Sequence, residues 1–162
     1  TPYEVITIFA DAISNGGNLL LDIAPKEDGT IPDQQVHVLK ELGKWNHKHE
    51  EAIFGTLGGM SQGHFYGPST LSKDSSTLYL FLPGKVNGPV VVKGLSNKIK
   101  SIRVVGTEQT LTHKIVGKIS WSPVPGLGYI DVPEAVQDTY MSVLAVELDG
   151  PLRLYKGQGG LQ

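Results

Sequence analysis

The sequence contains no cysteine, no long apolar run and no excess of basic residues. Without cysteine, the chain has no disulfide, no thiolate metal site and no cysteine nucleophile. No run approaches the roughly 18 apolar residues of a membrane-spanning helix, so we expect no membrane partner. The 14 Lys and Arg against 16 Asp and Glu give a net charge of -2. Because nucleic-acid-binding proteins carry a basic stripe, we expect no nucleic-acid partner either.

The chain begins at Thr1 rather than Met, and its first residues show no pattern typical of a signal peptide. We therefore expect a processed product, an engineered piece or a part of a longer protein. Its 162 residues are too few for a complete eight-fold β/α barrel, which needs roughly 250. Hydrophobic residues make up 40% and charged residues 19%, which is a globular composition and excludes a disordered tail.

Residues 1–55 predict a helix, a strand and a second helix. Thr1-Pro2-Tyr3-Glu4 is typical of a helix N-terminus, and Asn15-Gly16-Gly17 ends that helix. The nearly continuous apolar run at 18–24 predicts a parallel strand buried on both faces. The second helix begins at Pro32. A lone parallel strand has no partners for its backbone groups, so this part is not a fold by itself.

After a glycine-rich linker near 55–63, the pattern changes to short runs of β-branched and aromatic residues separated by turn residues. Along 142–148, Val143 and Ala145 alternate with Leu144 and Val146, which predicts two distinct faces. The spacing predicts an antiparallel β-sandwich. We expect strands at 69–72, 77–82, 90–93, 99–105, 110–116, 119–121, 129–132, 142–148 and 152–155.

Acidic residues in and after the predicted first strand are candidates for a site. Asp22 lies near the carboxyl end of the strand, the end at which β/α barrels place their active sites. It could support a site by accepting hydrogen bonds or serve as a catalytic acid, or it could be a buried carboxylate satisfied by neighbouring donors, which we favour. Lys26, Glu27 and Asp28 follow on a loop. Glycosidase carboxylates work across a bound sugar from different strand ends, so a solvated turn is the favoured interpretation.

Two further features carry weaker signals. His47 and Glu51 are four residues apart and could share a helix face that binds a metal. The segment does not match a His-Glu-x-x-His motif, and a histidine near a helix C-terminus also complements the helix dipole, so we assign no metal. Trp121 could serve as an aromatic platform for a sugar, but its strand spacing from Ile119 favours core or interface packing.

Specific motifs resemble glycoside hydrolase family 29, the α-L-fucosidases. The resemblance is carried first by the stretch 17–25, Gly-Asn-Leu-Leu-Leu-Asp-Ile-Ala-Pro, and by Asp28-Gly29-Thr30-Ile31-Pro32. The resemblance covers nearly the whole chain. The sequence differs from the family pattern at two positions of the first motif, since family members usually carry Asn at the position of Asp22 and Gly at that of Ala24. Further matching motifs are Leu42-Gly43-Lys44-Trp45, Glu51-Ala52-Ile53-Phe54-Gly55-Thr56, Gly63-His64-Phe65-Tyr66-Gly67-Pro68, Leu78-Tyr79-Leu80-Phe81-Leu82-Pro83 and Val104-Val105-Gly106.

The resemblance implies an α+β fragment of two parts. Residues 1–58 would be the last β/α unit of a (β/α)8-like barrel, in which 18–24 is the last strand. Residues 59–162 would be the C-terminal β-sandwich. The missing upstream barrel segment, or a complementary chain, would be the partner of the first part.

The resemblance also implies the activity of a retaining exo-glycosidase that removes terminal α-L-fucose from fucosylated glycans without a metal or cofactor, in an extracellular, periplasmic or lysosomal setting. The family's nucleophile and acid/base match no position in this chain, so we expect no catalytic residue here and an inactive isolated chain. The alternative is a non-catalytic accessory sandwich that binds carbohydrate or braces a partner domain. On the family interpretation, the residues expected near the substrate pocket are Asp22, Ala24, Pro25, Lys26, Glu27 and Asp28.

Overall fold

The structure is a computed structural model that describes residues 1–107 and 109–157. Two α-helices come first, α1 (Pro2–Ser14) and α2 (Asp33–Lys48). The predicted N-terminus of α1 is confirmed, because Thr1 Oγ1 accepts a hydrogen bond from the Glu4 amide and donates one to the Glu4 carboxylate. In the described part of the chain, neither helix is long and apolar enough to cross a membrane.

The segment between the helices differs from the prediction. Residues 18–24 form no strand and run as an exposed, extended stretch, in which the side chain of Leu20 is 95% exposed. The reason is physical: a parallel strand needs neighbouring strands for its backbone hydrogen bonds, and no described strand lies beside this one.

Five strands form the larger sheet, in the order β1-β2-β3-β8-β5 with every pair antiparallel. The longest pairing joins β3 and β8, from Thr77 opposite Glu147 to Pro83 opposite Met141. The five strands are β1 (Leu57–Gly58), β2 (Ser69–Leu71), β3 (Thr77–Pro83), β5 (Ile99–Val104) and β8 (Met141–Leu148).

A second antiparallel sheet has the order β4-β7-β6, with β4 (Val90–Lys93), β7 (Leu127–Ile130) and β6 (His113–Val116). Two short 3-10 helices complete the described elements, η1 (Glu50–Ala52) and η2 (Glu134–Val136). Most strand predictions are confirmed. The strands predicted at 119–121 and 152–155 do not form, and the latter stretch makes only an isolated bridge between Leu154 and Leu95.

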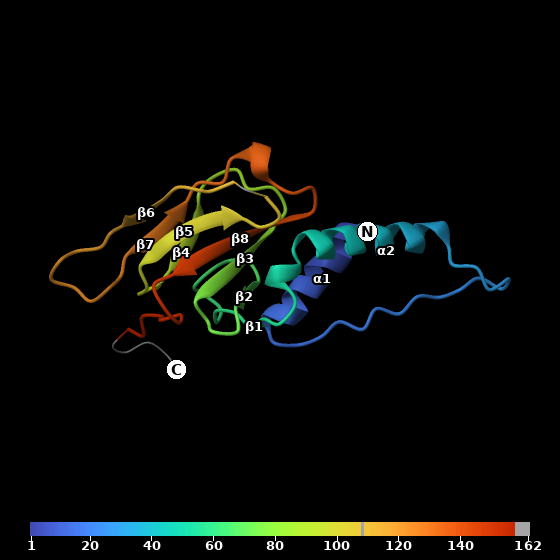
Figure 1. Cartoon of the computed structure of the whole chain (residues 1–162), viewed down its shortest axis with the longest axis horizontal. Coiled ribbons are helices and arrows are strands. Elements are labelled where there is room, and N and C mark those ends of the chain that lie inside the picture. Colours follow the sequence, from blue (N-terminus) through green and yellow to red (C-terminus); the bar gives the residue numbers. More distant parts are fainter. Residues whose placement is uncertain (108, 158–162) are drawn as a thin grey trace.

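The larger sheet lies between the smaller sheet and the two helices, so both of its faces are buried (Figure 1). Along β8, Leu144 and Val146 face the cluster between the sheets, whereas Val143 and Ala145 face the cluster under the helices. The predicted alternation is therefore confirmed. Ile6, Ala10 and Trp45 bring the helices into the second cluster, which also contains Phe81 of β3.

Trp121 does not join either cluster. Its side chain is 83% exposed, on the long connection between β6 and β7. The expectation of core packing is wrong, and packing against a partner stays a prediction. The expectation rested on the two-residue spacing from Ile119, which would place both side chains on one face of a strand. The chain instead forms a turn at Ser120 and Trp121, so the two residues share no strand face.

Candidate functional site

The residues predicted to lie near a substrate pocket stand on the connection from α1 to α2, which extends away from the sheets (Figure 1). Asp22, Ala24 and Pro25 are all exposed there. The interpretation of Asp22 as a buried, satisfied carboxylate is therefore wrong for this chain, because the strand that would bury it is not formed. A hydrogen bond links the connection to α2, since the Ala24 amide donates to Gln35 Oε1 at 3.2 Å.

The outer end of the connection is a hydrogen-bonded turn. The Lys26 amide donates to the carbonyl of Thr30 at 2.8 Å, and the Gly29 amide donates to that of Lys26 at 2.9 Å. Asp28 Oδ1 accepts from both the amide and the hydroxyl of Thr30, at 3.0 and 2.7 Å, and these bonds lower the pKa of Asp28. The predicted solvated turn is confirmed, and Glu27 lies exposed within it.

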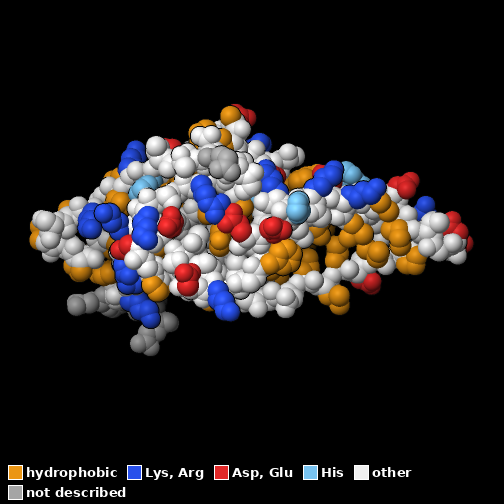
Figure 2. Space-filling view, viewed as in Figure 1, with side chains coloured by type: hydrophobic (Ala, Val, Ile, Leu, Met, Phe, Trp, Pro, Cys, Tyr) orange, Lys and Arg blue, Asp and Glu red, His pale blue; other side chains and the backbone are white. Residues whose placement is uncertain are grey.

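A shallow cavity of about 220 Å³ lies between the connection and α2, lined by Leu21, Asp22 and Ile23 on one side and by Val38 and Leu39 on the other. Around it, apolar side chains stay in contact with solvent. Figure 2 shows this apolar surface over the helical end of the molecule. Six large apolar side chains of α1, α2 and the connection between them are exposed, and we call them together the helical apolar face: Tyr3, Ile8, Leu20, Leu21, Ile23 and Leu39.

The pair considered for metal binding, His47 and Glu51, does not form a site. Glu51 instead accepts two hydrogen bonds from the guanidinium of Arg103, and His47 Nδ1 lies 3.7 Å from Glu50. The bonds from Arg103 lower the pKa of Glu51. Among residues 1–107 and 109–157, no group of three potential metal ligands comes together.

A buried histidine was missed at the sequence level. His49 is only 1% exposed, its ring packs against that of Trp45 with centroids 4.7 Å apart and planes tilted by 37°, and its Nδ1 lies 2.8 Å from the carbonyl of Trp45. Burial lowers the pKa of His49. The only available signal was its spacing of four residues from Trp45, which places the two side chains on one helix face.

Comparison with known proteins gives one consistent result. A family model described as "Alpha-L-fucosidase" matches residues 1–51, the helical part of the chain. The tissue alpha-L-fucosidase of Macaca fascicularis is 30% identical over 129 residues, which are 78% of this chain and 26% of that protein. The alpha-L-fucosidase of Dictyostelium discoideum is 40% identical over 53 residues, 33% of this chain and 12% of that protein. The chain thus spans about a quarter or less of these relatives.

Solved structures extend the similarity to both sheets. The alpha-fucosidase of Thermotoga maritima in complex with fucose has a TM-score of 0.73 and 28% identity, over 90% of this chain and 34% of that one. Alpha-L-fucosidase isoenzyme 1 from Paenibacillus thiaminolyticus has a TM-score of 0.77 and 24% identity, over 92% of this chain and 35% of that one. The arrangement of two helices on two sheets is therefore shared with these structures.

Proposed function

Since this chain belongs to the α-L-fucosidase family and corresponds to the C-terminal region of its members, we propose that it serves in a longer enzyme that hydrolyses terminal α-L-fucose from glycans. The observation that carries the proposal is the extent of the similarity. It covers 90% of this chain but only 34% of the Thermotoga maritima structure. The activity belongs to the larger protein.

The helical apolar face supports this role. Leu20 and Ile8 are exposed although they belong to a helix–loop–helix unit with an apolar pattern, and a concentration of exposed large apolar side chains is typical of an interaction site. We propose that upstream barrel segments cover this face. In their presence, residues 18–24 would pair with neighbouring strands and become the closing strand of the barrel, with Asp22 near its carboxyl end.

In that arrangement the turn at residues 26–30 follows the carboxyl end of the closing strand. Barrel enzymes build their active sites from such loops. Asp22, Ala24, Pro25, Lys26, Glu27 and Asp28 would then rim the fucose pocket, while the nucleophile and the acid/base would come from upstream strands. Hydrolysis with retention would proceed through a covalent glycosyl-enzyme intermediate.

The test compares the 162-residue chain with the longer protein that contains it. Both are assayed on an aryl α-L-fucoside, with an aryl β-D-galactoside as the control substrate. We expect turnover of the fucoside by the longer protein alone. Turnover by the isolated chain would contradict the assignment of catalysis to upstream residues, and failure of the longer protein on the fucoside would contradict the proposed activity itself.

A second experiment tests the proposed barrel contact. Leu20→Lys places a charge on the helical apolar face, and Val124→Lys places one on an exposed apolar side chain of the β6–β7 connection. In the longer protein, we expect Leu20→Lys to lower the free energy of unfolding by about 2 kcal/mol or more, because an unpaired charge would be buried. Val124→Lys serves as the control and should change the free energy of unfolding by no more than about 0.5 kcal/mol. Equal stability of the Leu20→Lys variant and the unmodified longer protein would contradict the contact.

A further inference from the structure

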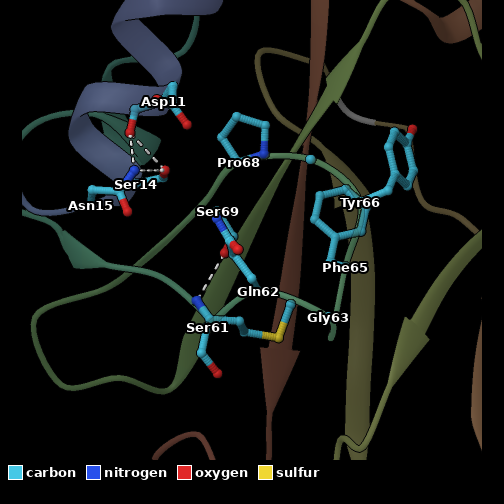
Figure 3. A pocket seen from close by; sticks show the side chains of 12 residues that line it. Asp11, Ser14, Asn15, Ser61, Gln62, Gly63, Phe65, Tyr66, Pro68 and Ser69 are labelled. Carbon is cyan, nitrogen blue, oxygen red and sulfur yellow. Dashed lines mark hydrogen bonds between the residues drawn. The ribbon is translucent and has the colours of Figure 1, made fainter.

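A cavity of about 380 Å³ lies between the end of α1 and the segment that leads from β1 to β2 (Figure 3). We call it the α1–linker pocket. Its volume falls in the range of roughly 300–1,000 Å³ that small-molecule sites occupy. Its lining comes from the last turn of α1 and from residues 60–69, namely Asp11, Ser14, Asn15, Met60, Ser61, Gln62, Gly63, Phe65, Tyr66, Gly67, Pro68 and Ser69.

One side of the α1–linker pocket is aromatic. The rings of Phe65 and Tyr66 lie with their centroids 4.7 Å apart and tilted by 54°, and Tyr66 is 61% exposed. Tyr66 also lines a second hollow of about 350 Å³, so this residue borders both that hollow and the α1–linker pocket. An exposed ring between two hollows offers an apolar face to a ligand that is itself amphipathic.

The backbone holds this aromatic side in place. A Cβ atom at Gly67 would lie 2.3 Å from the carbonyl oxygen of Phe81, so the chain after Tyr66 runs in close contact with β3. The Phe81 amide donates to the carbonyl of Pro68 at 3.0 Å, and the Met60 amide donates to Ser69 Oγ at 2.9 Å. The surface is therefore largely preformed, which lowers the entropic cost of binding.

The remaining lining is polar. Within the described part of the chain, the carboxylate of Asp11, the amide of Gln62 and the hydroxyl of Ser61 make no hydrogen bond to another residue. Asn15 Nδ2 and Ser14 Oγ donate to the backbone carbonyl of Asp11, as Figure 3 shows, and this fixes the end of the helix. The free groups include both acceptors and donors.

This combination selects a class of ligand. A carboxylate without a basic neighbour in the lining disfavours anionic ligands, and free acceptors and donors beside an aromatic face suit a neutral polyhydroxylated ring. We propose that the α1–linker pocket binds a neutral pyranose of a glycan, with an apolar sugar face against Phe65 and Tyr66 and with hydroxyl groups bound by Asp11 and Gln62. This proposal concerns binding only and does not depend on the hydrolytic activity proposed above.

The test titrates the 162-residue chain with methyl α-L-fucoside, methyl β-D-galactoside, methyl β-D-glucoside and N-acetylglucosamine, followed by NMR amide shifts. We expect saturable shifts at residues 11–15 and 60–69 with at least one sugar. Asp11→Ala and Tyr66→Ala should each weaken the binding about tenfold or more, whereas Trp121→Ala, which removes an even more exposed aromatic ring elsewhere, should leave it unchanged.

Two outcomes would overturn the proposal. One is the absence of saturable shifts with all four sugars, and the other is binding that Trp121→Ala weakens as much as Tyr66→Ala does. Gln62→Ala supplies an independent variant in case Tyr66→Ala alters the fold, and its binding should also weaken. The same titration on the longer protein tests whether an upstream segment fills the pocket. In that case Asp11→Ala would no longer weaken sugar binding in the longer protein, and this result would also overturn the proposal.

Discussion

The guanidinium of Arg103 donates hydrogen bonds to both carboxylate oxygens of Glu51, at 2.6 and 2.5 Å, and so joins strand β5 to the helix η1 that follows α2. The hydroxyl of Tyr79 donates to the same carboxylate at 3.4 Å. The helical layer is therefore attached to the larger sheet by a polar contact at its margin as well as by the apolar cluster beneath the helices.

We expect Glu51→Gln to lower the free energy of unfolding at neutral pH by about 0.5–1 kcal/mol, because the ion pair is partly exposed. Since the folded pKa of Glu51 is lowered, its contribution is complete above the ordinary value of 4.5 and is lost as the pH falls through the folded pKa. Urea unfolding at decreasing pH should show the two proteins converging. Glu50→Gln is the control, and an equal effect of both variants would contradict the assignment.

Replacing each of the two tryptophans by phenylalanine should have different effects on stability, because Trp45 is buried and Trp121 is exposed. Trp45 is 3% exposed, and its Nε1 donates to the carbonyl of Met141 at 2.8 Å. We expect Trp45→Phe to cost about 1–3 kcal/mol, because that carbonyl loses its donor, and Trp121→Phe to stay within about 0.5 kcal/mol. Quenching by acrylamide should be weak in Trp121→Phe and strong in Trp45→Phe. Similar quenching in the two variants would refute the placement of these side chains.

The sequence predicted the sandwich because its strands obey local rules. Neighbouring residues of a strand point to opposite faces, and both Val143 and Leu144 are apolar and buried, one in each cluster. This pattern can be recognised without knowing the partner strands. The run at 18–24 has an equally strong apolar pattern, but a parallel strand depends on neighbours that the described chain does not supply. Local pattern could not predict the Arg103–Glu51 pair either, since 52 residues separate the partners and only the fold brings them together.

Two glycines with nearly the same positive φ test the close packing between the end of α2 and the turn that follows β5. Gly16 and Gly106 have φ values of 73° and 75°. A Cβ atom at Gly106 would lie 2.5 Å from Lys48 Cγ and 2.9 Å from the Lys48 carbonyl oxygen, whereas one at Gly16 would meet nothing within 4 Å. We expect Gly16→Ala to cost about 1–2 kcal/mol through strain alone, and Gly106→Ala to cost more. Thermal unfolding that ranks the two variants equally would contradict the contact.

The buried ring of His49 predicts a loss of stability in mild acid. Its folded pKa lies below the ordinary 6.5 because burial disfavours the charged ring. The unfolded state therefore binds more protons, and the free energy of unfolding falls as the pH drops below about 6.5. Guanidinium unfolding between about pH 7.5 and 5 should show this slope. His49→Gln, although less stable, should reduce the slope, and the exposed His47→Gln should retain it. An unchanged slope in His49→Gln would show that another group titrates.

The last prediction concerns the turn that we propose to rim the fucose pocket. Asp28→Ala removes the two hydrogen bonds from Thr30 that shape the turn. In the longer enzyme, we expect KM for an aryl α-L-fucoside to rise about threefold to tenfold, because a loosened loop positions the substrate less well. Asp74 supplies a matched control in the turn between β2 and β3, where it accepts bonds from Ser72 and Ser76 that lower its pKa to about 2. Asp74→Ala should leave KM unchanged. If the two variants shift KM equally, the loop acts only through general stability, and its place at the pocket is wrong.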